Sequence, residues 1–175
     1  MKKVMFLLAL LVASTATLVQ AQNNKQPLSP KMTVQSPNKT VKVVYGQPSK
    51  RGREIFGALV PYGQVWRTGA NEATEITFAK DVMFGNKMVK AGTYTLFTIP
   101  TKDEWTVILN SKLGEWGAYE YEKNKGKNVA EVKVPAKTAK APMEKMTITP
   151  TNNDLSIAWD QVMVSIPIKE SSTVN

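Results

Sequence analysis

The stretch TYTLFTIPTKDEWTVIL, residues 93–109, decides the fold class of this chain of 175 residues. It contains two runs rich in β-branched and aromatic residues, 93–99 and 104–109, on either side of Pro100–Asp103. Two such runs joined by a four-residue polar loop predict an antiparallel hairpin. Both runs carry apolar residues on both faces, so we expect the two strands to be central strands of a sheet.

Shorter runs of alternating polar and apolar residues lie on both sides of this hairpin. The residues expected to point inward are Val41, Val43, Tyr45, Ile76, Phe78, Val132, Val134, Met146, Ile148, Leu155, Ile157, Trp159, Val162, Val164, Ile166 and Ile168. Gly85-Asn86 and Asn152-Asn153 are turn signals. No window has a sustained helical period, and the best helix candidate, residues 115–125, would be short and exposed. The sequence therefore predicts an all-β domain, an antiparallel β-sandwich or jelly-roll-like barrel with at most one short helix.

The N-terminal residues predict export. Lys2 and Lys3 precede an apolar run, residues 4–13, and Val19-Gln20-Ala21 places small residues where a signal peptidase cleaves. This layout is typical of a signal peptide over residues 1–21, with an uncleaved N-terminal anchor as the alternative. We expect export by the Sec route to the periplasm or the outside of the cell, and no membrane span after cleavage.

The remaining chain is divided by its composition. Residues 22–31 contain two prolines and are interpreted as a flexible leader, residues 32–168 as a single β domain, and residues 169–175 as a flexible tail. Residues 123–142 hold six lysines and no aromatic residue. They are interpreted as a solvated loop around one strand, because such a stretch offers little apolar surface to a core.

The composition excludes large parts of enzyme chemistry. The chain has no cysteine and no histidine. It therefore cannot use thiol catalysis, a Ser-His-Asp triad, or a thiolate or imidazole metal site, and we expect no cofactor and no metal. The net charge is +9, but only Arg51, Arg53 and Arg67 of the 23 basic residues are arginine. Because nucleic-acid readers favour arginine, we expect no nucleic-acid partner.

The segment from Arg51 to Glu72 is rich in glycine and proline and is predicted to be an ordered surface loop. Within it, Trp66 offers a flat apolar face, Arg67 a fixed fork of donors, and Asn71 and Glu72 further polar groups. Such residues could hold a sugar, with its ring stacked on Trp66. The alternative is structural: Arg67 would pair with Glu72 or Glu75, and Asn71 would bond backbone in a turn.

A second candidate patch, LGEWGAYEY, covers residues 113–121. Trp116 lies between glycines, so together with Tyr119 it would form either a stacking platform for a ligand or a lid over the core. Glu115, Glu120 and Glu122 lie nearby. Paired carboxylates hydrolyse glycosidic bonds when they are held about 5–10 Å apart, which keeps a glycosidase-like activity as an alternative.

Several long stretches resemble one known family. LVPYGQVWRTGANEATEITFAKDV at 59–82, KAGTYTLFTIP at 90–100 and WTVILN at 105–110 are similar to the exported bacterial domain of unknown function 2911. The resemblance covers about residues 29–168. It implies a single all-β domain behind a signal peptide, sometimes fused to other domains. No activity or catalytic residue is established for the family, so none is carried over.

The sequence thus favours an exported, non-catalytic binding module of the bacterial envelope. Its ligand would be a saccharide or another polar molecule near residues 66–72 and 116–119. The alternatives are a hydrolase that uses carboxylates alone, and a structural component that binds an envelope protein.

Overall fold

The computed structural model of the chain describes residues 27–171. The predicted signal peptide lies outside these residues, as does most of the predicted leader. Two antiparallel sheets pack face to face, and the sheets of the described chain do not close into a barrel. The predicted all-β sandwich is therefore confirmed. No helix within residues 27–171 is long and apolar enough to cross a membrane.

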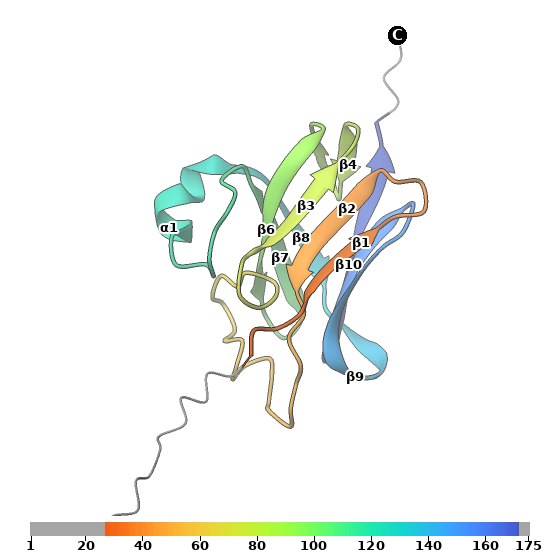
Figure 1. Cartoon of the computed structure of the whole chain (residues 1–175). Coiled ribbons are helices and arrows are strands. Elements are labelled where there is room, and N and C mark those ends of the chain that lie inside the picture. Colours follow the sequence, from red (N-terminus) through yellow and green to blue (C-terminus); the bar gives the residue numbers. More distant parts are fainter. Residues whose placement is uncertain (1–26, 172–175) are drawn as a thin grey trace, which may run out of the picture.

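The larger sheet has six strands. In spatial order they are β1 (Lys31–Gln35), β2 (Val41–Gly46), β3 (Thr74–Phe78), β6 (Gly92–Pro100), β7 (Glu104–Asn110) and β8 (Asn128–Pro135). The smaller sheet has four: β5 (Lys87–Val89), β4 (Val82–Phe84), β10 (Asp154–Glu170) and β9 (Lys137–Pro150). A short helix, α1 (Tyr121–Asn124), and a 3-10 turn at Lys125–Lys127 follow β7. In Figure 1, α1 lies on the opposite side of the six-stranded sheet from β9 and β10.

The main core lies between the two sheets and contains the residues that alternation predicted to point inward. All of them are buried except Val162, which is half-buried against the core. Alternation predicts these buried residues because successive side chains of a strand point to opposite faces of the sheet. The turn signals also hold, since Gly85-Asn86 joins β4 to β5 and Asn152-Asn153 lies between β9 and β10.

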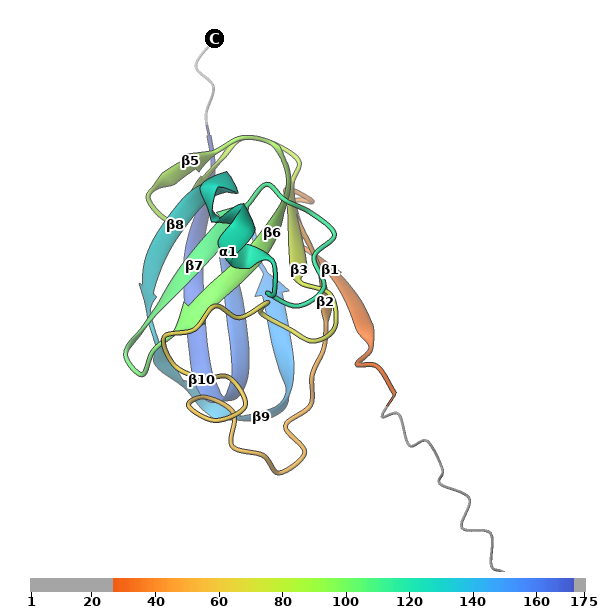
Figure 2. The same ribbon diagram turned by 90° about the vertical axis from the view of Figure 1, so that its left-hand side faces the viewer.

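The predicted hairpin forms two interior strands of the six-stranded sheet, β6 and β7, which lie between β3 and β8. The apolar face of this hairpin that points away from the smaller sheet is also buried. Phe97 and Ile108 are buried with Ala73 and Tyr121 in a small outer core, where the rings of Phe97 and Tyr121 meet at 5.1 Å. Figure 2 shows α1 in front of β6 and β7, and β9 and β10 behind them. Both faces of the central strands are therefore covered.

The lysine-rich segment corrects the sequence prediction. Residues 123–142 are not a solvated loop around one strand, because β9 begins at Lys137 and runs for 14 residues. Its first residues, Lys137 and Thr138, pair with Met163 and Val162 of β10. Backbone pairing of this kind needs no apolar side chains, so a segment with exposed lysines can still be a strand.

The expected helix at residues 115–125 is also wrong in extent. Only Tyr121–Asn124 is α-helical. Upstream of it, Gly117 has a φ of 71°, which is incompatible with a continuing helix. Backbone groups of that segment bond elsewhere: the amide of Ala73 donates to the carbonyl of Glu115 at 2.8 Å, and the amide of Gly117 donates to the carbonyl of Asn71 at 3.1 Å.

The C-terminal strand extends past the predicted end of the domain. β10 runs to Glu170, so residues 169–170 belong to the sheet and not to a tail; likewise β1 begins at Lys31, inside the predicted leader. The carboxylate of Glu170 accepts hydrogen bonds from the Thr40 hydroxyl and from the Lys80 ammonium, the latter at 2.9 Å. These bonds, with the Thr40 bond contributing most, lower the pKa of Glu170 below its ordinary value.

This lowered pKa predicts a pH dependence of stability. A carboxylate whose folded pKa is lowered contributes stability above its unfolded pKa of about 4.3, and this contribution is lost as the pH falls through the folded value. We expect Glu170→Gln to destabilise the protein at pH 7, and the difference from wild type to shrink as the pH falls below about 4. Urea unfolding between pH 7 and pH 3 measures it. Asp103→Asn is the control, because the Asp103 carboxylate has no hydrogen bond or ion pair with residues 27–171. A difference that stays constant down to pH 3 would contradict the prediction.

Candidate functional site

The loop between β2 and β3, residues 47–73, crosses one end of the sandwich and is drawn in orange to yellow at the bottom of Figures 1 and 2. It is tied to the sheet by backbone bonds. Trp66 and Thr98 of β6 exchange two of them, at 2.7 and 2.9 Å. Ala70 donates to the carbonyl of Gly46 at 3.0 Å, and the buried Thr68 hydroxyl lies 3.0 Å from that of Thr98. The prediction of an ordered loop is therefore confirmed.

Trp66 is held between the core and the surface. Its half-buried ring stacks on Trp159 of β10, with centroids 6.0 Å apart and planes at 18°. Phe56 and Trp105 approach it edge-on. Its indole nitrogen donates to the carbonyl of Gly69 at 3.2 Å. Trp66 is thus partly a packing residue, but the edge that remains accessible lines a hollow of the surface.

The polar residues after Trp66 do not form the ion pair that the structural interpretation required. Arg67 donates through Nε to the carbonyl of Gly69 at 3.2 Å, and within residues 27–171 it has no ion pair with Glu72 or Glu75. Glu72 instead lies 3.7 Å from the ammonium of Lys31.

Asn71 bonds backbone, as the structural alternative expected, but the backbone is that of a distant segment and not of its own turn. It adopts a positive φ of 63°, and its side-chain amide donates to the carbonyl of Ser29 at 3.0 Å. It therefore fixes the segment that enters β1 against the loop.

Two adjoining hollows lie at this end of the sandwich. One has a volume of about 470 Å³ and is lined by Arg51, Arg53 and Asn71, among others. The second, of about 250 Å³, is lined by Arg53, Arg67, Leu59, Val60 and the two stacked indoles of Trp66 and Trp159. Ser29, Pro48 and Arg53 border both. We call the two together the arginine cleft.

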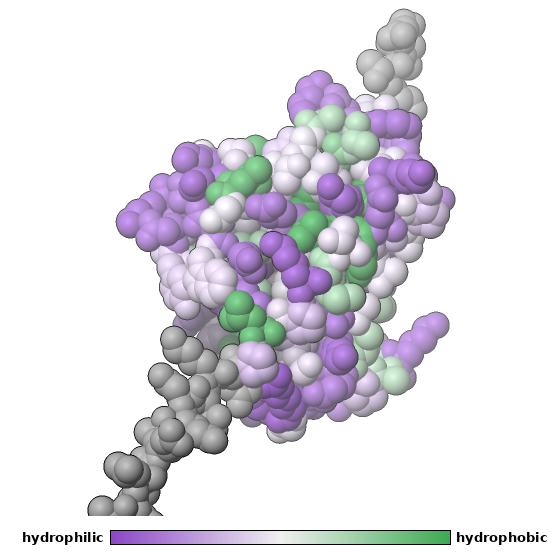
Figure 3. All heavy atoms as spheres, in the orientation of Figure 1, coloured by the Kyte–Doolittle hydropathy of each residue, from purple (hydrophilic) through white to green (hydrophobic). Residues whose placement is uncertain are grey.

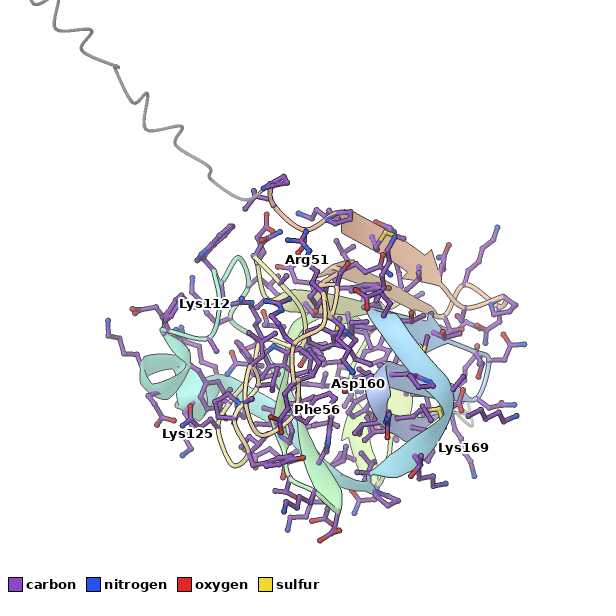
Figure 4. The ribbon with its side chains drawn as sticks, turned by 90° about the horizontal axis from the view of Figure 1, so that it is seen from below. Arg51, Phe56, Lys112, Lys125, Asp160 and Lys169 are labelled. Atoms are coloured by element: carbon purple, nitrogen blue, oxygen red, sulfur yellow. The ribbon has the colours of Figure 1, made fainter. Side chains whose placement is uncertain are left out.

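All three arginines of the chain line this cleft. Figure 4 shows Arg51 at this end of the molecule, beside the start of β1. Sequence reasoning singled out Arg67 but not Arg51 or Arg53. The signal was present, because all three arginines fall in one loop. What the sequence lacked was the chain path that brings residues 51–53 next to residues 66–67.

The side chain of Arg53 is fixed by backbone carbonyls. Arg53 donates from Nε to the carbonyl of Lys50 at 2.9 Å, and from Nη2 to that of Ser49 at 2.6 Å. The backbone amide of Arg51 donates to the Glu144 carboxylate at 2.8 Å. No aspartate or glutamate lines either hollow of the cleft. The cleft is therefore positively charged, with donors in fixed positions.

The two aromatic residues of the second predicted patch, Trp116 and Tyr119, do not line either hollow. Trp116 and Tyr119 are 53% and 77% exposed. Trp116 pairs through its backbone with Glu72. Because both aromatic side chains are exposed, they do not form a lid over the core. They remain available as contact residues beside the cleft, because a Cβ atom at Gly117 would lie 2.6 Å from the Tyr119 ring and 3.3 Å from Nη1 of Arg67.

The carboxylates named as hydrolase candidates are dispersed. Glu120 and Glu122 are exposed and lie near Lys123 and Lys125. Glu115 is buried, and its carboxylate accepts a bond from the Asn124 amide at 3.3 Å. It lines a small hollow of about 140 Å³ that also contains Glu72 and Glu75. No group of three or more acidic residues within 27–171 is placed to hold a metal ion.

One family of known proteins matches this chain. The family described as "Protein of unknown function (DUF2911)" matches residues 29–168, which include both sheets except the last two residues of β10 and the lining of the arginine cleft except Pro27 and Leu28. No match was found among curated proteins or among solved structures. The chain therefore belongs to the DUF2911 family.

Proposed function

We propose that this protein is an exported, non-catalytic binding domain of the bacterial envelope, and that its ligand occupies the arginine cleft. One observation carries the proposal: all three arginines converge on adjoining hollows beside two stacked indoles. Export rests on the signal-peptide pattern of residues 1–21. Binding sites commonly lie on loops that a rigid sheet holds in place, as the β2–β3 loop is held here.

The chemistry of the cleft suits a small polar ligand. The larger hollow, of about 470 Å³, lies within the range of known small-molecule sites, about 300–1,000 Å³, and the adjoining hollow adds about 250 Å³. The half-buried indole of Trp66 and the exposed side chain of Leu59 offer apolar contact, and the guanidinium groups offer hydrogen-bond donors. A saccharide or another compact molecule with both polar and apolar parts fits this lining.

The two alternatives find less support. A glycosidase needs two facing carboxylates in its cleft. None lines the arginine cleft, and the hollow that contains Glu72, Glu75 and Glu115 measures only about 140 Å³, below the roughly 300 Å³ of the smallest known small-molecule sites. A structural component would need an exposed apolar patch. On the face seen in Figure 3, hydrophobic residues form small groups separated by polar ones. Binding of a small ligand is thus the function that the geometry favours.

The four tryptophans allow a direct test. Trp66 and the largely buried Trp159 line the cleft, Trp105 is buried, and Trp116 is exposed outside the two hollows. We expect at least one member of a panel of sugars, amino acids and their charged derivatives to shift the indole NMR signals of Trp66 and Trp159. The shift should saturate, and the amide signal of Gly85, in the β4–β5 turn at the other end of the sandwich, should stay in place as the internal control. The protein should lack only residues 1–21.

A thermal-shift assay gives a second measurement. A ligand at about 100 times its Kd adds about 2.7 kcal/mol to the unfolding free energy. For a domain of this size that is a rise in Tm of roughly 5–10 °C. If no compound moves the two cleft indoles, or if binding moves only Trp116, the proposed site is wrong.

A further inference from the structure

We infer that the ligand is an oxyanion, a small organic molecule whose carboxylate or phosphate group is bound by Arg53 and Arg67; this rests on the proposed function. The first observation is the distribution of cation types. Arginine occurs only around the cleft, while the other basic residues of the chain are lysines. The planar fork of arginine matches carboxylate and phosphate oxygens in pairs, which the point charge of lysine does not.

The second observation is that the two guanidinium groups are held in place and still have N–H donors available for a ligand. The guanidinium of Arg53 is anchored by two carbonyls, through Nε and Nη2. Its Nη1 makes no hydrogen bond with residues 27–171. Arg67 is anchored through Nε alone, so within the same part of the chain both of its terminal nitrogens lack a hydrogen-bond acceptor. Because these side chains are already positioned, binding an anion costs little further ordering.

The third observation is the missing counter-charge. Other hollows of the described chain mix both signs: Lys31 shares one with Glu72, and Lys133 shares another with Glu131. The second hollow of the arginine cleft contains Arg53 and Arg67 and has no carboxylate in its lining. Arg53 and Arg67 have no ion pair with any described residue, in contrast to Lys50, which lies 2.5 Å from Asp160. An anionic ligand would supply the charge that the protein omits here.

The fourth observation concerns the rest of the ligand. Beside Arg67, the accessible apolar lining of the second hollow comes from the half-buried indole of Trp66 and the exposed side chain of Leu59. An inorganic ion would leave this surface uncovered. A ring or a short apolar body attached to the anionic group would cover it, which gains binding energy from buried apolar area.

Matched pairs of neutral and anionic probes test the inference. Glucose is compared with glucuronate and with glucose 6-phosphate, and benzamide with benzoate, by NMR titration of the cleft indoles. We expect at least one anion to bind at least tenfold more tightly than its neutral counterpart. Comparison of glucuronate with glucose 6-phosphate shows whether the site prefers a carboxylate or a phosphate. Affinity should fall as sodium chloride is raised from about 50 to 300 mM, since exposed charges are screened.

Variants identify the residues. Arg67→Lys keeps the charge and removes the fork, and we expect at least a tenfold loss of anion affinity. Arg53→Lys should do the same, but it also removes bonds that fix the loop, so Arg67→Lys is the primary variant. Lys102→Ala, an exposed lysine of the β6–β7 turn, is the control and should bind as wild type.

The failures are distinguishable. If neutral probes bind as tightly as the anions, or if folded Arg67→Lys binds anions normally, the oxyanion inference is wrong while the binding site stands. If no probe in any pair moves the indoles of Trp66 and Trp159, both the inference and the proposed function fail.

Discussion

Replacing Gly46 by alanine is expected to destabilise the domain by about 3 kcal/mol and to disrupt the arginine cleft. Gly46 ends β2, and a Cβ atom there would lie 2.0 Å from the carbonyl oxygen of Ala70 and 2.8 Å from its carbonyl carbon. These are backbone atoms of the β2–β3 loop. The same loop donates a hydrogen bond from Ala70 to the carbonyl of Gly46. Because no side chain can rotate away, the loop itself must move.

Urea unfolding measures this loss, and Gly126→Ala is the matched control. Gly126 has no atom within 4 Å of the added Cβ, so its substitution should change the unfolding free energy by less than about 0.5 kcal/mol. We also expect the indole NMR signal of Trp66 to move in Gly46→Ala, because Trp66 is carried by the displaced loop. Equal stability of the two alanine variants would show that the loop does not pack on β2 as described.

Phe97→Ala is expected to lower the free energy of unfolding by about 3–5 kcal/mol. We also expect it to loosen the segment with α1 that packs on the outer core. Phe97 is 1% exposed and packs against Tyr121 and Ile108 on the side of the sheet that faces away from β10. The only helix of the described chain is four residues long, too short to be stable by itself. Its position therefore depends on the contact between the rings of Phe97 and Tyr121.

Amide hydrogen exchange separates this local effect from global loss of stability. In Phe97→Ala, protection should fall first in residues 118–127, before the amides of the β9–β10 pair. Tyr119→Ala is the control, since Tyr119 is an aromatic residue of the same segment but is 77% exposed. It should lose less than about 0.5 kcal/mol. Uniform loss of protection throughout Phe97→Ala would argue against a separate outer core.

Predictions for the strands succeeded where side-chain pattern and backbone structure coincide. Leu155, Ile157 and Trp159 alternate with polar residues and are buried as expected. The prediction failed at residues 137–142, where β9 is formed through backbone pairing with β10 and the exposed side chains carry no strand pattern. The helix prediction failed at residues 115–120 because the backbone there bonds to the β2–β3 loop.

The candidate site was predicted in part. Residue types in a glycine-rich loop directed attention to Trp66 and Arg67, both of which line the cleft. The same reasoning gave equal weight to Glu72, which instead forms an ion pair with Lys31 of β1. It also gave no role to Arg53, although Arg53 borders both hollows.

By itself, the sequence determined the all-β class, the inward faces of most strands and the absence of thiol and imidazole chemistry, because alternation and composition are local properties of the chain. Only the tertiary structure decided which residues share a surface. Trp66 stacks on Trp159, and Arg53 and Arg67 line the same hollow, because of the path of a loop held by Gly46 and Thr98. Such contacts depend on how distant segments pack, which no local pattern encodes.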